Sequence, residues 1–569
     1  MFLPVAKEEI KKLGWDKPDI ILVSGDTYID TSFDGVAVIG RVLQDAGYKT
    51  AIIAQPDINS PSDITRLGEP ALFWGVSGGC VDSMVANYTA LKKRRNSDDM
   101  TPGGVNSSRP DRAVSAYVNL IRRYFKNTKP IIIGGVEASL RRIAHYDYWD
   151  NSVRRSILFD SKADLLVYGM GEKTILEIAN ALKEESTYQD IRGLCYISKD
   201  KNEEYAELPP YESVRDDKQE FIKMFTTFYK NSDPLNAKGL FQKHGDRYLI
   251  QNPPQINPTP GELDRIYNLG YMRDVHPYYK KLGKVKALDT VQFSVTSHRG
   301  CYGECNFCSI TVHQGRRITS RSIESITKEI ESMVNHPQFK GIISDIGGPT
   351  ANMFMNNCSV MDTKGACKNK RCASPEKCSK MDANHIPSIE LMKAARKVPG
   401  VRKVFVGSGV RYDLVVADKE TGDKYLYDII ENHVSGQMKI APEHTDNEVL
   451  KLMGKPANKN LAEFKKKFGA FSAKAGKKQF LTYYFIAAYP GCDMNKMNDL
   501  NKFIRNELKL NPEQVQIFTP TPSTYATLMY YTGLDPFSGN TLFVEKDKLN
   551  KQKQKDVLID SNNKKSKKF

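Results

Sequence analysis

The sequence predicts an α/β protein in two parts, an N-terminal doubly wound domain at residues 1–185 and a partial (βα)6 barrel of the TIM type at residues 286–540. Short apolar runs alternate with amphipathic stretches through the first third of the chain, and a second alternating series begins at residue 291. Near-continuous apolar strands separated by helices are typical of a parallel sheet that helices cover on both faces.

Five apolar runs are the expected strands of the N-terminal domain: DIILVSG (19–25), TAIIAQ (50–55), ALFWGVSG (71–78), PIIIGGV (130–136) and DLLVYGMG (164–171). Three of them run into glycine, at Gly75, Gly134–Gly135 and Gly169–Gly171. The carboxyl ends of such strands form the crevice where doubly wound sheets bind ligands, although the same glycines would also suit tight strand-to-helix turns. No G-x-G-x-x-G pattern follows the first strand, which argues against a dinucleotide site.

Residues 186–285 are rich in Lys, Glu, Asn and Pro, and we expect them to connect the two domains with short helices. The expected barrel strands are VQFSVTSHRG (291–300), GIISDIGG (341–348), VRKVFVGSG (401–409), GQMKIAPE (436–443), QFLTYYFIAAYPG (479–491) and EQVQIFTPTP (513–522). Strands followed by helices or turns in this way predict a site at their carboxyl ends. We expect residues 541–569 to form a disordered tail, because the last 24 residues hold nine Lys and three Asp.

The composition excludes several classes of protein. Of 569 residues, 40% are apolar and 10% aromatic, which is enough to fold most of the chain around real cores. The N-terminus lacks the apolar stretch of a signal peptide, and no apolar run elsewhere reaches the length of a membrane-spanning helix. We therefore expect a cytoplasmic protein that does not contact a membrane.

Seven of the ten cysteines fall within residues 301–378. Cys301, Cys305 and Cys308 follow the first predicted barrel strand with the spacing C-x3-C-x2-C. Cysteine thiolates are the preferred ligands of iron–sulfur clusters, and three of them on one loop leave one iron of a cubane free to bind another molecule. The alternative is a structural zinc site with His313 as the fourth ligand.

The pattern C-x3-C-x-aromatic-C after the first barrel strand, with Phe307 at the aromatic position, resembles the signature of the radical S-adenosylmethionine (SAM) enzymes. Longer stretches resemble one branch of that superfamily, the YgiQ family: TPGGVNSSRPDRA (101–113), IIIGGVEASLRRIAHYDYWD (131–150), RRSILFDSKADLLVYGMGE (154–172), DIGGPTANMF (345–354) and KIAPEHTDNEVLKLMGKP (439–456). The resemblance runs from about residue 15 to residue 540.

This resemblance implies a [4Fe–4S] cluster held by Cys301, Cys305 and Cys308, with SAM bound to the fourth iron. One electron from the reduced cluster would break the S–C5′ bond of SAM and yield a 5′-deoxyadenosyl radical. A low-potential electron donor such as flavodoxin or ferredoxin is implied as a partner. The substrate is unknown.

The resemblance also implies residues that contact SAM. Gly347, Gly348 and Pro349 occupy the place of a GGE-type motif, with proline where the family has an acid. Ser408 and Arg411 are implied to contact the SAM carboxylate and ribose, and an ion pair is the alternative use of the arginine. Residues 443–444, Glu and His, stand where related enzymes carry a Glu-Ser-Gly segment near the ribose; a structural, hydrogen-bonded histidine is the alternative.

A second group of cysteines lies in a Lys- and Asn-rich insert at residues 356–385, namely Cys358, Cys367, Cys372 and Cys378. The insert is too polar to be expected to form a core of its own, so we expect a bound group to order it. A second iron–sulfur cluster and a structural zinc ion are both compatible with these ligands.

The N-terminal domain resembles the cobalamin-binding domain that precedes the barrel in one branch of radical SAM enzymes, and DLLVYGMGE is similar to a strand of that branch. Where that branch would offer an axial histidine in a D-x-H-x-x-G segment, this chain has GDTYIDTSFDG (25–35). The sequence therefore argues against cobalamin as a cofactor.

Two rival functions remain open at this point. The net charge of +16 and the aromatic and arginine residues of 144–156 suit an RNA-modifying or nucleic-acid-binding protein with a radical SAM barrel. The same residues would equally form a domain interface. The other rival is a non-catalytic scaffold that keeps an iron–sulfur cluster.

Overall fold

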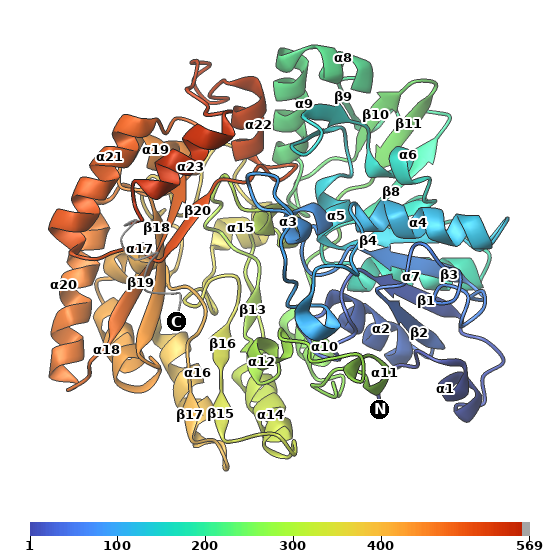
Figure 1. Ribbon diagram of the computed structural model, residues 1–569, viewed down its shortest axis with the longest axis horizontal. Helices are drawn as coiled ribbons and strands as arrows, with labels where there is room; N and C mark the ends of the chain where they lie inside the picture. Colours follow the sequence, from blue (N-terminus) through green and yellow to red (C-terminus); the bar gives the residue numbers. More distant parts are fainter. Residues whose placement is uncertain (560–569) are drawn as a thin grey trace.

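The computed structural model describes residues 1–559, and its N-terminal half is built on one nine-stranded sheet (Figure 1). Five parallel strands stand in the order β2-β1-β3-β4-β7. Their bounds are β1 Ile20–Ser24, β2 Thr50–Ala54, β3 Phe73–Ser77, β4 Ile131–Gly134 and β7 Leu165–Val167. This is the flavodoxin-like doubly wound order, whose switch point lies between β1 and β3.

Helices cover both faces of this sheet, because successive residues of a strand point to opposite sides. In β1, Ile21 and Val23 belong to one apolar core and Ile20 and Leu22 to another. Helices α2 (Gly35–Asp45) and α7 (Glu172–Lys183) pack together, as do α4 (Ala113–Tyr124) and α6 (Ile157–Ser161). The doubly wound prediction is confirmed.

Residues 186–285 do more than connect the domains, so that expectation is wrong in part. Four of their segments extend the sheet beyond β7 as β8-β11-β10-β9. The strands are β8 Leu194–Ser198, β9 Ala206–Leu208, β10 Leu240–His244 and β11 Arg247–Gln251. The polar composition concealed them because exposed positions such as Lys243 and Arg247 are polar, and because tertiary contacts bury further polar residues such as Gln242.

The C-terminal half contains six successive parallel strand segments, as predicted for a partial barrel. They are β12 (Ser294–Thr296), β15 and β16 (Ile342–Ile343 and Asp345–Gly347), β17 (Lys403–Val404), β18 (Gln437–Glu443), β19 (Phe480–Ala487) and β20 (Gln514–Ile517). The parallel pairs are β12 with β16, β15 with β17, β18 with β19, and β19 with β20. Helices α14 (Ile323–Val334), α16 (Ile386–Lys397), α18 (Gly422–Asn432), α20 (Lys459–Lys474) and α21 (Met494–Phe503) follow the strands on the outside (Figure 1).

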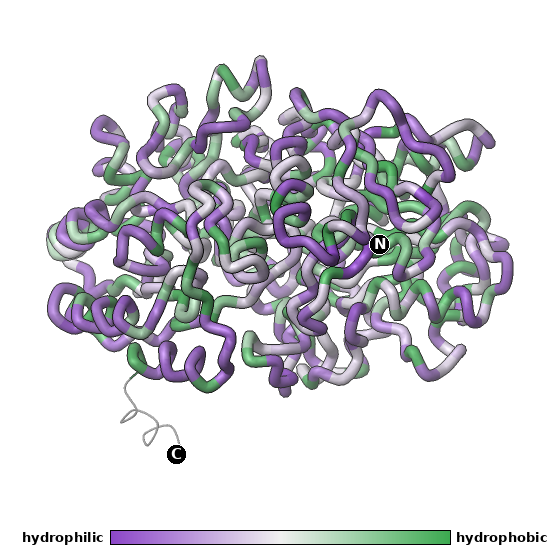
Figure 2. Tube along the Cα trace, turned by 90° about the horizontal axis from the view of Figure 1, so that it is seen from above, coloured by the Kyte–Doolittle hydropathy of each residue, from purple (hydrophilic) through white to green (hydrophobic). Residues whose placement is uncertain are grey.

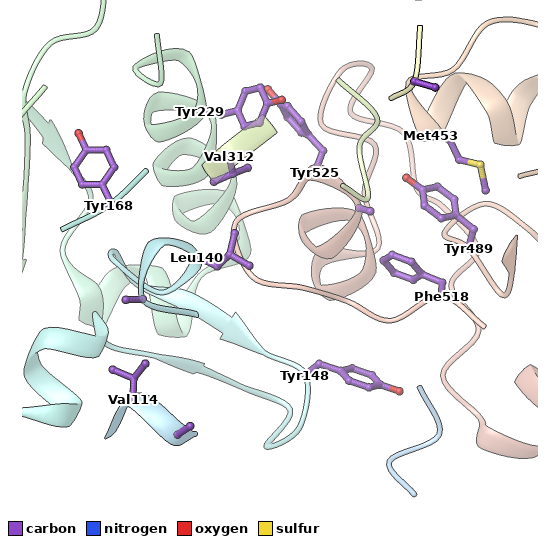
Figure 3. Packing of buried hydrophobic residues seen from close by; sticks show 14 of the residues in the cluster. Val114, Leu140, Tyr148, Tyr168, Tyr229, Val312, Met453, Tyr489, Phe518 and Tyr525 are labelled. Carbon is purple, nitrogen blue, oxygen red and sulfur yellow. The ribbon is translucent and has the colours of Figure 1, made fainter. Parts of the chain in front are cut away.

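One apolar core continues from the N-terminal sheet into the barrel. Figure 3 shows it passing from Val114 and Leu140 to Tyr525, Phe518 and Tyr489. Along the Cα trace, many of the segments at the rim of the molecule are hydrophilic (Figure 2). None of the helices between residues 1 and 559 combines the length and the apolar character that a membrane crossing requires.

The aromatic segment at residues 144–156 belongs to this junction. Tyr146 stacks on Tyr531 with ring centroids 4.7 Å apart, and Tyr148 meets Tyr530 edge to face at 5.6 Å. Both partners lie on α22 (Tyr525–Thr532) of the C-terminal half. The segment is therefore a domain interface, and its buried tyrosines are not free to stack on bases.

The prediction of a disordered tail from residue 541 is wrong for the part that the structure describes. Lys548–Asp556 forms helix α23, in which Lys551 and Gln554 are each only 1% exposed. Lys551 donates hydrogen bonds to the hydroxyls of Tyr148 and Tyr530, at 3.3 and 2.9 Å. The lysine-rich composition predicted disorder wrongly because tertiary contacts bury Lys551. Residues 560–569 lie outside the part of the chain that the structure describes.

Candidate functional site

The three-cysteine loop begins directly after β13 (His298–Arg299), at the mouth of the barrel. Cys301 Sγ lies 3.9 Å from Thr350 Oγ1 and 3.9 Å from Met353 Sδ. The ring of Phe307 meets Tyr489 edge to face at 6.3 Å. The loop is thus held against the strand ends of the barrel by a polar contact with Thr350 and by apolar contacts with Met353 and Tyr489.

The thiols of this loop lie close enough to influence one another. Burial, together with the neighbouring Cys305 and Cys301, raises the pKa of the Cys308 thiol to about 12. Burial also raises the pKa of Cys301, whereas the positive charge of Arg411 lowers it. These thiols therefore stay protonated unless a metal ion binds, and the iron of a cluster is a cation that would stabilise them as thiolates.

Within residues 1–559, no three His, Cys, Asp or Glu side chains are already arranged as a metal site. The donor set on the loop nevertheless fits a cluster, since three thiols on eight consecutive residues are ligands that iron–sulfur clusters prefer. The one carboxylate of the loop, Glu304, is paired with Arg316 at 3.2 Å. His313, the candidate fourth zinc ligand, is half-buried, and its Nδ1 lies 3.1 Å from Ser139 Oγ.

Gly347, Gly348, Pro349 and Ser408 all line one cavity, as expected for residues at the carboxyl ends of neighbouring strands. The side chain of Ser408 is committed to Asp345, whose Oδ1 also accepts the N–H groups of Gly407 and Ser408 at 2.8 and 3.1 Å. This carboxylate fixes the loop after β17, so the backbone of Gly347 and Gly348 is the part left open to a ligand.

Arg411 makes an ion pair, which is the alternative use of this arginine that the sequence left open. Its Nε and Nη2 donate to the two carboxylate oxygens of Asp413 at 2.7 and 2.6 Å. The guanidinium also lies against Gly303 of the cysteine loop. It is therefore placed beside the cysteines as well as near the strand ends.

Glu443 and His444 end strand β18 in different environments. Glu443 has a left-handed backbone, with φ of 67°, and burial raises the pKa of its carboxyl. Its Oε1 lies 3.7 Å from Lys455 Nζ. His444 accepts the N–H of Asp446 through Nδ1 at 3.0 Å and places Nε2 3.4 Å from Cys492 Sγ. Burial lowers the pKa of His444 to about 4, so the alternative of a structural histidine holds at neutral pH.

The insert at residues 356–385 does form a small core, contrary to expectation. Cys358, Met361 and Met381 are buried in it together with Tyr302 and Met353. Cys372 and Cys378 pack against the same core, whereas Cys367 is exposed. The buried methionines supply apolar area that the lysine-rich composition of the insert concealed. A metal site at these four cysteines remains a prediction.

A cavity of about 430 Å³ lies between the carboxyl edge of the N-terminal sheet and the barrel. Gly75, Gly135 and Gly169 line it from the sheet, and Gly347 and Gly348 line it from the barrel. The glycines of the sheet were identified from the sequence. Gly347 and Gly348 were also expected at a site, but their meeting with the glycines of the sheet in one cavity was not, because no local pattern states which loops of two distant domains face each other.

The walls of the cavity carry few net charges. Glu172 and Arg299 neutralise each other at 2.5 Å. Burial lowers the pKa values of His298 and His313 to about 4, so both rings are neutral at pH 7. Burial raises the pKa of Asp34 to about 8, which keeps this carboxyl largely protonated. A large uncharged ligand suits such a surface.

Three buried polar atoms in the walls have no hydrogen-bond partner among the described residues: Ser32 Oγ, Asp34 Oδ2 and His298 Nε2. Buried polar groups are normally satisfied, so their partners are expected to come from a bound molecule or water.

The fold and the cysteine loop define a radical SAM protein, and the family described as Radical SAM N-terminal matches residues 2–294. The chain belongs to the UPF0313 family. A UPF0313 protein of Fusobacterium nucleatum is 57% identical over 98% of this chain and 99% of its own length. One from Thermotoga neapolitana is 47% identical over 98% of both chains.

Solved structures agree with this fold. The radical SAM methyltransferase TsrM from Kitasatospora setae has a TM-score of 0.53 at 13% identity, over 96% of this chain and 89% of its own. The cobalamin-dependent radical SAM enzyme OxsB has a TM-score of 0.50 at 14% identity, over 92% of this chain and 56% of its own.

These structures overturn the argument against cobalamin. TsrM was solved with cobalamin and a [4Fe–4S] cluster bound, and OxsB with aqua-cobalamin bound. That argument rested on one absent histidine in residues 25–35, whereas the similarity extends over both domains. The absence of an axial histidine is therefore no ground for excluding cobalamin.

Proposed function

We propose that this protein is a radical SAM enzyme that holds a [4Fe–4S] cluster through Cys301, Cys305 and Cys308 and cleaves SAM reductively. The observation that carries the proposal is the position of the cysteine loop, which adjoins the glycine-lined strand ends of the barrel. When bound, the reduced cluster supplies the electron that breaks the S–C5′ bond of SAM and so generates a 5′-deoxyadenosyl radical. The electron must come from a low-potential donor such as flavodoxin or ferredoxin.

The residues around the loop have separate tasks in this proposal. Phe307 packs with Tyr489 and keeps water from the cysteine side. The backbone of Gly347 and Gly348 faces the ligand, since these residues line the cavity and carry no side chain. Asp345 holds the following loop in place through Ser408. Excluding water in this way protects a reactive radical from side reactions.

We further propose a corrinoid as the occupant of the cavity between the domains. The support is its position between the two domains, its largely neutral walls and the unpartnered polar atoms of Ser32, Asp34 and His298. Corrinoids carry many uncharged carboxamide groups, which can both donate to and accept from such atoms. The substrate remains unassigned.

Release of 5′-deoxyadenosine tests the radical SAM function. The full chain is reconstituted anaerobically with iron and sulfide, reduced with dithionite, and given SAM; we expect 5′-deoxyadenosine by liquid chromatography. A variant with Cys301, Cys305 and Cys308 replaced by Ala should release none. Cys195→Ala, which alters a buried thiol in the N-terminal sheet, is the matched control and should retain release. Equal release from wild type and the triple variant would refute the proposal.

A further inference from the structure

The guanidinium of Arg411 lies directly on the cysteine loop. If Gly303 carried a Cβ, that atom would be 2.4 Å from Nη1 of Arg411 and 3.2 Å from Sγ of Cys301. A separation below 3.0 Å between such atoms does not occur in real proteins. Glycine between the first two cysteines is therefore what allows the arginine to approach the thiols.

Asp413 holds the arginine in this position. It accepts from Nε and Nη2 at 2.7 and 2.6 Å, and the two side chains are 6% and 11% exposed for Asp413 and Arg411. Such a two-point pair fixes the plane of the guanidinium. Nη1, the nitrogen nearest Gly303, donates to no acceptor among the described residues.

We propose that Arg411 donates a hydrogen bond from Nη1 to a sulfur of the cluster bound by Cys301, and thereby stabilises the reduced form of that cluster. This inference rests on the proposed function, since it requires a cluster on the loop. Asp413 is the positioning residue. The role differs from the contact with the SAM carboxylate or ribose that the sequence resemblance implied.

The physical basis is the charge that the cluster gains on reduction. Hydrogen bonds to the sulfurs and the net charge nearby are known determinants of the reduction potential of an iron–sulfur cluster. In a buried site the guanidinium interacts strongly with the added electron because little water screens it. Removing Arg411 should shift the potential in the negative direction, whereas neutralising Asp413 should leave a net positive charge and shift it in the positive direction.

The experiment is a redox titration of the reconstituted full chain, followed by electron paramagnetic resonance and carried out without SAM. In Arg411→Met we expect the equilibrium ratio of reduced to oxidised cluster to fall about tenfold at a given potential, which is about 59 mV for a one-electron couple. Asp413→Asn should shift the potential in the opposite direction. Iron and sulfide analysis of each sample confirms that the cluster is present.

Two further variants separate this role from a structural one. Gly303→Ala keeps the arginine but displaces it from the loop, and should lower the potential as Arg411→Met does. Arg273→Met removes a buried arginine that pairs with Glu329 elsewhere in the fold, and should leave the potential unchanged.

The outcomes distinguish the inference from the proposed function. If the reconstituted wild-type chain shows no [4Fe–4S] signal, the proposed function fails. If the cluster forms but Arg411→Met keeps the wild-type potential, or if Arg411→Met and Asp413→Asn shift it in the same direction, the inference fails alone. An unchanged potential combined with weaker SAM binding would assign Arg411 to SAM instead.

Discussion

Gly135 offers a direct test of the cavity, because its conformation and its surroundings can be perturbed separately. This residue begins α5 (Gly135–Leu140) with φ of +81°, and a Cβ there would lie 2.7 Å from Ser77 Oγ. In Gly135→Ala the left-handed backbone costs about 1–2 kcal/mol. Ser77 must also rotate and lose the hydrogen bond that it accepts from Gly79 at 3.2 Å, which adds about 1 kcal/mol.

Gly14→Ala is the matched control, since Gly14 has a similar φ of +69° and a Cβ there would meet no atom within 4 Å. We expect its thermal unfolding midpoint to fall by the backbone cost alone, and that of Gly135→Ala to fall about 2 °C further. Hydroxocobalamin binding, followed by absorption, should weaken in Gly135→Ala only. Equal midpoints in the two variants would refute the crowding at Ser77, and unchanged binding in Gly135→Ala would refute the cavity as the corrinoid site.

Three further predictions concern charge and metal content. Burial lowers the pKa of His298 from 6.5 to about 4, so between these pH values the unfolded chain binds a proton that the folded chain does not. The free energy of unfolding should therefore fall from pH 6.5 toward pH 4, by about 3 kcal/mol for the full shift. His298→Gln should flatten this part of the curve of unfolding midpoint against pH, and parallel curves for the variant and wild type would contradict the assignment. A chain that lacks the three cysteines of residues 301–308 should still bind iron or zinc if the cysteines of residues 358–378 form a second site, and metal analysis showing neither would exclude that site. Burial lowers the pKa of Lys551 from 10.5 to about 8, so protease resistance of the C-terminal helix should increase between pH 8 and 10.5 in wild type but not in Lys551→Met; the same increase in both would show that Lys551 is not responsible.

Much of the fold could be predicted because it depends on local patterns. The apolar runs that contain Gly75 and Gly134–Gly135 form parallel strands, since a strand covered on both faces needs apolar residues at nearly every position. The strands of residues 186–285 escaped prediction for the opposite reason. In β10 and β11, polar residues such as Gln242 and Gln251 are buried by tertiary contacts and do not produce an apolar run.

By itself the sequence determined the architecture of the two domains, the radical SAM character and the loop that carries Cys301, Cys305 and Cys308, because each depends on residues close together in the chain. Tertiary structure alone decided that the β-strand ends of both domains enclose one cavity, that Lys551 is buried, and that Arg411 lies on Gly303. These features join residues more than a hundred positions apart, and only the packing of the complete chain brings such residues within contact distance.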